Sequence, residues 1–414
     1  MRIVPLRKTK YDIIVKYLNK IKRMGVFSKF NSSNVIIFNS KSLNGAVTFV
    51  NDPISGNYGL SFFIGDDGLN TLSDMFMISD ESFNMSSYYL TNVIYKKEYN
   101  LEPQDYDYFK KHNIPVKRIN NVVFNTYEEG FAMHTATSDI ADKVFELLCS
   151  LYIVLMNKFD YVEETFKKED KVIITSVDFE NLTFTVNESE LPYLEKKLPY
   201  QKYSSEEHEY FEGINPENYE MLLITRGGNT PIAIKECNKA VIPLLVSFNK
   251  KDLPLSFFDV IISLPGDWRS QILFLLKDYF NENGIPRKII INNRKLYFGL
   301  YELLSSFGIE CVLQLENPQY DLMLEDINAA LFEEYPYTIR DQDFCTTPEA
   351  DFRKTISYVK KFFSLYFEDS LFDLPDEILN NPTIKRLINI ITQTQEVIED
   401  EYEEITDSDS DLIS

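Results

Sequence analysis

Basic and apolar residues alternate at helical spacing near the start of the chain. The apolar residues Ile13, Ile14, Tyr17, Leu18 and Ile21 recur with a period close to that of an α-helix, which predicts an amphipathic helix. The first 30 residues hold nine lysines and arginines against one acid. We expect this helix either to pack within a domain with its cationic side in solvent, or to contact an anionic partner or a lipid surface.

Short runs of β-forming residues follow this helical pattern. Val35–Phe38, Ala46–Val50 and Tyr58–Ile64 are separated by Asn-Gly and Ser-Gly-Asn sequences, which are typical of turns between antiparallel strands. Later, Thr137–Phe159 carries a broad apolar face and predicts a long helix, with Ser138 as its cap. Val172–Val186 predicts two strands around a turn.

Strands and helices alternate after residue 219. The predicted strands are Met221–Thr225, Ile232–Ile234, Ile242–Phe248, Phe258–Leu264, Ile289–Ile291 and Ile309–Leu315. The predicted helices are one capped by Asp267 and ending at Gly284, and one at Lys295–Phe307. This order indicates βαβ units in a partly parallel sheet.

The chain is therefore predicted to contain an α+β domain, built of an antiparallel sheet with helices, followed by an α/β domain. The α+β domain takes residues 1–165, and a hairpin and polar connector take 166–218. The α/β domain takes 219–335, a helical segment 336–395, and an acidic tail 396–414. This tail holds nine acids and no base, so we expect it to be disordered.

The predicted α/β domain resembles the ribonuclease H-like fold of integrases and transposases. The segments Gly284–Asn293 and Phe307–Glu310 are similar to the family pattern in which an aspartate closes one strand before the next. Enzymes of this kind hold two metal ions with strand-borne carboxylates. The matching position here is Asn292, and Met221–Thr225 contains no acid. Because an amide is a poorer ligand for Mg²⁺, the resemblance implies a domain without the family's metal site.

A second resemblance covers both predicted domains. Tyr58–Leu69, together with Ile285–Ile289 and Phe307–Ile309, is similar to a group of bacterial two-domain proteins of unknown function. The resemblance implies a bacterial cytoplasmic origin and the same domain order, and it supplies no activity.

The net charge limits the possible partners. The chain has 42 basic and 64 acidic residues, a net charge of -22, which argues against general binding of nucleic acid through clustered lysines and arginines. The longest apolar stretch, Phe145–Met156, is shorter than the ~20 residues needed to cross a bilayer. We expect a cytoplasmic protein without a membrane span.

The side chains that usually hold cofactors or metals are few and scattered. The four cysteines show no zinc spacing, so we expect buried thiols in a reducing compartment. The three histidines, His112, His134 and His208, show no metal-binding spacing, and no phosphate loop or dinucleotide motif is present. We expect no cofactor and no metal.

One compact basic group stands out beyond the N-terminus. Arg287, Lys288, Arg294 and Lys295 flank a predicted strand, and ligands of open α/β sheets bind near strand ends. These four residues are the predicted binding site.

The favoured hypothesis is a non-enzymatic adaptor or regulator that binds a macromolecule, with a protein as the expected partner. One alternative is a divergent metal-dependent enzyme acting on nucleic acid, with ligands such as Asp267, Glu302 or Glu310. Another is an acidic decoy or inhibitor in conflicts between bacteria and mobile elements, acting through the acidic tail.

Overall fold

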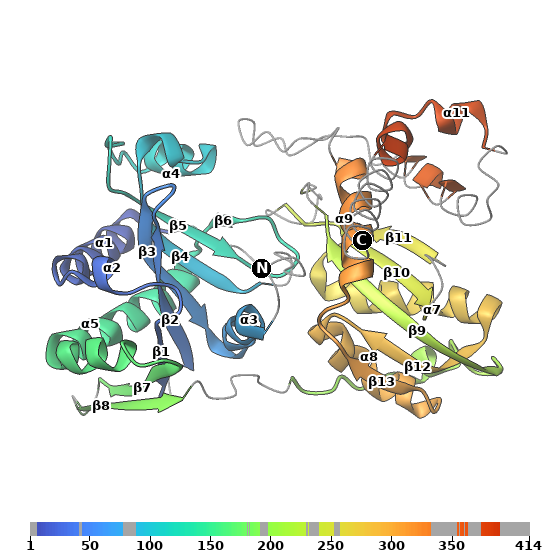
Figure 1. The fold of residues 1–414 in the computed structure, drawn as a ribbon, viewed down its shortest axis with the longest axis horizontal. Helices are drawn as coiled ribbons and strands as arrows, with labels where there is room; N and C mark the ends of the chain where they lie inside the picture. The colour runs from blue at the N-terminus through green and yellow to red at the C-terminus, as the bar shows by residue number, and fades with distance from the viewer. Residues whose placement is uncertain are drawn as a thin grey trace, which may run out of the picture. The chain divides into compact units, whose positions relative to one another are not determined.

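The chain folds into two units of mixed helices and strands, each with one sheet (Figure 1). Unit 1 comprises Met1–Leu198, Lys235–Ala240 and Ile339–Gln342, and unit 2 comprises Pro199–Ile234, Val241–Thr338 and Asp343–Ser414. The computed structural model describes residues 6–40, 44–77, 88–179, 181, 183–190, 198–228, 231, 240–251, 257–332, 354–355, 357–359, 361–362 and 374–389. The predicted acidic tail at 396–414 and the predicted strand Ile232–Ile234 lie outside these residues.

Unit 1 is built around an eight-stranded sheet. Its strands are β1 (Val35–Asn39), β2 (Asn44–Asp52), β3 (Asn57–Ile64), β4 (Leu90–Lys96), β5 (Asn121–Tyr127), β6 (His134–Thr135), β7 (Lys171–Asp178) and β8 (Thr183–Glu190). They run in the order β6-β5-β4-β3-β2-β1-β7-β8. The predicted antiparallel pairing of the first three strands is confirmed, because β2 pairs antiparallel with both β1 and β3.

Helices cover the two faces of this sheet unequally. The helices of unit 1 are α1 (Lys8–Arg23), α2 (Val26–Lys29), α3 (Gly65–Met77), α4 (Pro103–Lys111) and α5 (Ser138–Phe166), with a 3₁₀ turn at Glu98–Asn100. α1, α2 and α5 lie on one face, and α3 lies on the other (Figure 1). The predicted amphipathic helix is confirmed as α1, although Ile13 is 46% exposed and Tyr11 is buried in its place.

The hairpin predicted at Val172–Val186 is present as β7 and β8, but it belongs to the first sheet and not to a connector. β7 pairs in parallel with β1, as in Ile36 opposite Ile173. Parallel pairing requires a long crossover, which α5 supplies. The helix is capped by Thr137 and not by Ser138, since the Thr137 hydroxyl accepts from the amide of Ile140.

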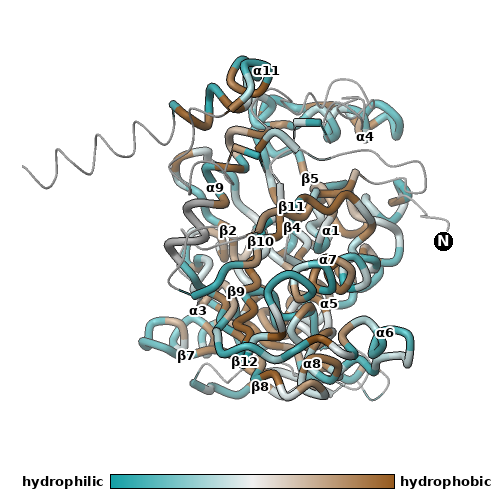
Figure 2. The backbone as a smooth tube through the Cα atoms, turned by 90° about the vertical axis from the view of Figure 1, so that its right-hand side faces the viewer, coloured by the Kyte–Doolittle hydropathy of each residue, from teal (hydrophilic) through white to brown (hydrophobic). Residues whose placement is uncertain are grey.

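Unit 2 contains a five-stranded sheet in the order β11-β10-β9-β12-β13. Its strands are β9 (Pro216–Gly227), β10 (Leu244–Lys250), β11 (Phe257–Ile261), β12 (Ile285–Ile291) and β13 (Glu310–Leu313). β10 pairs antiparallel with β9 and β11, whereas β12 pairs in parallel with β9 and β13. The predicted partly parallel sheet is therefore confirmed. The hydropathy colouring in Figure 2 includes brown stretches at β10, and residues 244–249 of this strand are all buried, as expected for a strand buried on both faces.

Helices cover both faces of the second sheet. They are α6 (Ser205–Glu209), α7 (Trp268–Asn283), α8 (Arg294–Ser306), α9 (Pro318–Phe332) and α11 (Asp376–Leu379). α7 and α8 pack on one face, while α9 and residues between 354 and 389 pack on the other. None of the helices among the described residues holds an apolar stretch long enough to cross a membrane.

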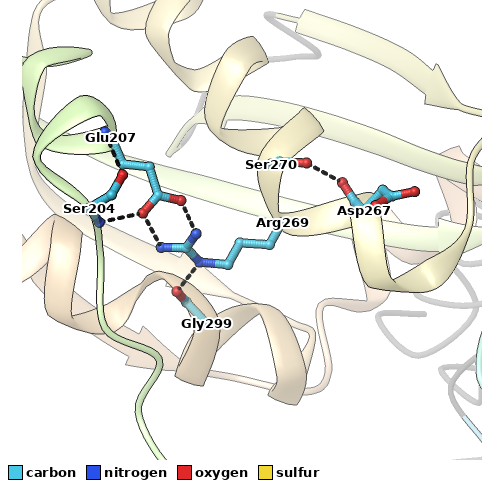
Figure 3. Close-up of polar contacts among 6 residues, drawn as sticks. All are labelled: Ser204, Glu207, Asp267, Arg269, Ser270 and Gly299. Atoms are coloured by element: carbon cyan, nitrogen blue, oxygen red, sulfur yellow. Dashed lines mark hydrogen bonds and ion pairs between the residues drawn. The ribbon is translucent and has the colours of Figure 1, made fainter.

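The start of α7 differs from the prediction. Asp267 occupies the cap position but its side chain makes no capping hydrogen bond. The residue ends a 3₁₀ turn, Pro265–Asp267, and has near-helical φ and ψ of -97° and -6°, whereas a capping side chain requires extended backbone. Its carbonyl accepts from the Ser270 hydroxyl instead (Figure 3). Gly284 ends the helix with a φ of 78°, as predicted.

The predicted polar connector, 166–218, contains the short helix α6, which is held to α7 and α8 of unit 2 by polar contacts. Ser204 and Glu207 cap α6 reciprocally, because each side chain accepts from the other residue's amide. The Glu207 carboxylate also pairs with Arg269 on α7, whose Nε donates to the carbonyl of Gly299 on α8 at 2.6 Å (Figure 3). The spacing Ser-x-x-Glu is the sequence signal of such a cap. One arginine thus joins three helices.

The contacts of Glu207 with Arg269 and Ser204 depend on pH. Burial by itself would raise the pKa of Glu207, but the hydrogen bonds from Arg269 and from the Ser204 amide outweigh burial and lower the pKa below its ordinary value of 4.5. A carboxyl whose pKa is lower in the folded state stabilises the fold above its unfolded pKa. This stabilisation is lost as the pH falls through the folded pKa.

We expect Glu207→Gln to lower the free energy of unfolding of unit 2 by about 1–3 kcal/mol at pH 7, because the Arg269 guanidinium loses a charged partner. Trp268, the only tryptophan, is buried beside Arg269, so its fluorescence during urea unfolding measures this change. The difference from wild type should shrink as the pH falls below about 4.5. Glu206→Gln, at an exposed neighbour, is the control. An equal loss in both variants would contradict the prediction.

Candidate functional site

The four predicted binding residues do not form one patch. Arg287 and Lys288 lie near the start of β12 and pair with Glu220 at 2.7 Å and with Glu310 at 3.2 Å. Arg294 and Lys295 lie in the first turn of α8, past the other end of β12. Arg294 lies six positions after Lys288 along a mostly extended chain, which corresponds to roughly 20 Å. Arg294 is also buried, with 8% of its surface exposed.

The end of β12 carries an amide locked to its neighbouring strand. Asn292 Oδ1 accepts from the Thr225 amide at 2.8 Å and from the Thr225 hydroxyl at 3.2 Å, and its Nδ2 donates to the Thr225 carbonyl at 3.0 Å. Asn292 thus uses both of its polar atoms to join β9 and β12. The two strand positions that face each other here present a hydroxyl and an amide, and no carboxylate.

The carboxylates proposed as alternative metal ligands come from separate elements. Asp267 precedes α7, Glu302 lies within α8, and Glu310 starts β13 and pairs with Lys288. In the part of the chain that the structure describes, no three His, Cys, Asp or Glu side chains gather closely enough to hold a metal ion.

The thiols in the described residues are poor nucleophiles. Cys149 and Cys311 are free and half-buried. Burial raises the pKa of Cys149 to about 11 and that of Cys311 to about 12, so both remain protonated at neutral pH, whereas the thiolate is the reactive form. Cys237 and Cys345 lie outside the described residues.

A groove in unit 1 gathers positive charge that the sequence analysis did not assign. It consists of two adjoining hollows of about 380 and 280 Å³ between α1 and the segment 114–122. Both hollows share the residues Val15, Lys117, Asn120 and Val122. We call this feature the cationic groove.

Four cations line the cationic groove: Lys8, Lys22, Lys117 and Arg118. None of them takes part in an ion pair between described residues. Among the described residues that line the groove, Asp12 is the one acid.

Short-range contacts hold the wall of the groove in shape. Asn121 accepts from the Lys117 amide at 2.7 Å and donates to the Lys117 carbonyl at 2.6 Å. Asn120 has a left-handed φ of 63°, which asparagine tolerates better than most residues. These contacts fold the chain back on itself and leave Lys117 and Arg118 exposed.

Lys22 is the most constrained of the four cations. Its Nζ donates to the Tyr58 hydroxyl and, at 3.0 Å, to Asn120 Oδ1. It also lies 4.6 Å from the ring centre of Tyr95 and 4.9 Å from that of Tyr58, within the range of cation–π attraction. A positive charge is therefore fixed in the groove without a carboxylate partner among the residues that the structure describes.

The sequence contained a signal for this groove. Lys110-Lys111 and Lys117-Arg118 form two basic pairs within nine residues, a density comparable to that of the predicted cluster. The pairs were missed because the helix and the segment that face each other in the groove lie about 100 residues apart in the chain.

Comparisons with known proteins identified no relative: no family model, no curated protein and no solved structure matches this chain. Inferences about function therefore depend on the chemistry of the chain itself.

We expect Asn292→Asp to lower the free energy of unfolding of unit 2 by about 1–3 kcal/mol, because a carboxylate oxygen would face the Thr225 carbonyl in place of a donor. Asn293→Asp is the matched control. Asn293 caps α8 by accepting from the Leu296 amide at 3.0 Å, and aspartate caps equally well. Urea unfolding followed by Trp268 fluorescence measures both variants. Equal stability of the two would show that the Asn292 amide is not needed.

Proposed function

We propose that this protein is a non-enzymatic adaptor or regulator that binds an acidic segment of a protein partner in the cationic groove. The observation that carries the proposal is the convergence of Lys8, Lys22, Lys117 and Arg118 on one groove with no ion-pair partner among the described residues. Like charges held close together repel each other, so an anionic ligand would relieve this repulsion.

A protein partner is favoured over nucleic acid by the overall charge. A net charge of -22 opposes the approach of a polyanion whose every repeat is charged. A short acidic segment needs only the local field of the groove, which extends over ~8 Å at physiological ionic strength.

We also propose that unit 2 has a ribonuclease H-like fold that has lost its metal site. The order of its strands supports this: a three-stranded antiparallel part is followed by two parallel strands with a helix between them. Thr225 and Asn292 stand on adjacent strands where the resemblance implies carboxylates, and they satisfy each other by hydrogen bonds. This supports a binding role over metal-dependent cleavage.

We expect the double variant Lys117→Gln/Arg118→Gln, made in the full chain, to lose binding to the protein partner. Affinity purification from host lysate, with and without nuclease, measures this. A protein should co-purify with wild type after nuclease treatment and should be reduced at least ten-fold with the variant, since two of four groove charges are removed.

Arg287→Gln/Lys288→Gln is the matched control, because it removes the same two charges from the site predicted by sequence. This control should retain the partner. Equal retention by both double variants would reject the groove as the binding site. Loss of the bound material on nuclease treatment would identify nucleic acid as the ligand and reject the protein partner.

A further inference from the structure

The larger hollow of the cationic groove, of about 380 Å³, holds most of the groove's positive charge. Lys22, Lys117 and Arg118 line this hollow, and no carboxylate of a described residue lines it. Asp12 lines the smaller hollow instead. Three positive charges held within one hollow repel each other. A ligand that carries more than one negative charge in a small volume therefore suits the larger hollow better than a single carboxylate.

Contacts within the fold already occupy hydrogen-bond acceptors of this hollow. Asn19 Oδ1 accepts from the Tyr95 hydroxyl at 3.0 Å. Asn120 Oδ1 accepts from both Lys22 and the Tyr58 hydroxyl. Four backbone carbonyls of the lining also accept hydrogen bonds, those of Val15, Lys117, Arg118 and Val122. A ligand with N–H or O–H donors therefore finds these acceptors in use.

The hydrogen-bond donors of the same hollow remain available. The Lys22 ammonium has three N–H groups and donates to Tyr58 and Asn120, which leaves one N–H for a ligand. Asn120 Nδ2 donates to no described residue. The Lys117 and Arg118 side chains make no hydrogen bond or ion pair with a described residue either. The hollow thus complements a group that carries negative charge and only accepts hydrogen bonds.

A phosphomonoester fits this description more closely than a carboxylate. It carries a charge of about −1.5 to −2 at pH 7 and three strong acceptor oxygens, whereas a carboxylate has one charge and two oxygens. The Arg118 guanidinium can donate to two phosphate oxygens at once. Lys22 is already held by Tyr58 and Tyr95, so ordering it against a ligand costs little side-chain entropy.

The smaller hollow adds an apolar surface beside the charged one. Tyr11, Phe109, Ile114 and Pro115 are among its lining residues. Because the two hollows share part of their walls, an apolar side chain next to a phosphorylated residue can enter the smaller hollow. This arrangement favours a peptide over a lipid headgroup. The net charge of -22 also opposes approach to an anionic membrane surface.

We propose that the cationic groove binds a phosphorylated segment of the protein partner, with the phosphoryl group in the larger hollow. The phosphoryl oxygens accept from Lys22, Asn120 Nδ2 and Arg118, and Lys117 adds positive charge. An apolar residue beside the phosphorylated one occupies the smaller hollow. The inference rests on the proposed function, because it identifies the acidic group that the groove recognises.

Two blocked peptides test the proposal: Ala-phosphoserine-Leu-Ala, and the same peptide with glutamate in place of phosphoserine. Calorimetry on the full chain should show at least ten-fold tighter binding of the phosphopeptide. Equal binding of the two peptides would overturn the phosphoryl assignment and leave the proposed function standing. Absence of binding by both peptides would overturn this proposal, and partner capture by the Lys117→Gln/Arg118→Gln variant would then decide separately on the proposed function.

Two further measurements identify the source of the phosphoryl group. Phosphatase treatment of the host lysate should abolish capture of the partner by the wild-type chain, and a partner retained after this treatment would overturn the proposal alone. Binding to vesicles that contain a phosphoinositide, without binding to the phosphopeptide, would assign the hollow to a lipid headgroup and also overturn the proposal.

Asn120→Asp ties phosphopeptide binding to the donors of the larger hollow. The variant replaces the Nδ2 donor with a negative oxygen and keeps an acceptor for Lys22 and Tyr58, so it should weaken phosphopeptide binding at least ten-fold without lowering the melting temperature. Asn113→Asp is the matched control, because Asn113 is also an exposed asparagine with a left-handed φ, of 52°, and is not among the residues that line the groove. Equal phosphopeptide binding by the two variants would overturn the proposal.

Discussion

The packing of α5 against α1 and against the eight-stranded sheet is the contact on which unit 1 depends. Seven of its valine and leucine side chains are completely buried: Val144, Leu147, Leu148, Leu151, Val154, Leu155 and Val162. At ~1.5–3 kcal/mol for each large apolar side chain, they contribute on the order of 10 kcal/mol. The same helix provides the crossover that lets β7 pair in parallel with β1. Lys10 and Lys20 of α1 contact α5. Lys8 and Lys22 instead line the cationic groove together with Lys117 and Arg118.

The width of the sheet explains why its other face differs. Eight strands at ~4.8 Å spacing span roughly 34 Å, whereas one helix is ~10 Å wide. α3 is the one described helix on that face, and it packs on β2 and β3. The strands β4 and β5 lie beyond the two strands that α3 contacts most. There Asn92 on β4 and Asn125 on β5 are paired across the strands and project to the same face of the sheet.

Local patterns predicted the elements well, and non-local pairing was the main source of error. The helix around Ile14 and Leu18, the antiparallel strands before Ile64 and the βαβ order of unit 2 follow from periodicity and turn residues, which depend on neighbours in sequence. The parallel pairing of Ile36 with Ile173 joins residues 137 positions apart, and no local pattern encodes it. The lock between Glu207 and Arg269 was missed for the same reason, although the cap of α6 was visible in the sequence.

The basic clusters likewise could not be evaluated from the sequence alone, because the fold decides which residues surround each cation. Two of the binding residues predicted from sequence proximity, Arg287 and Lys288, form ion pairs with Glu220 and Glu310 on neighbouring strands. Strand pairing brings these acids beside them from distant parts of the chain. In the cationic groove the opposite holds, because Lys22 is held by Tyr58, Tyr95 and Asn120, none of which carries a negative charge at neutral pH. A net charge of -22 therefore coexists with a fixed positive site. Whether a basic cluster can bind an anionic ligand therefore depends on the residues that each cation contacts in the fold. The number of cations in a segment of the sequence matters less.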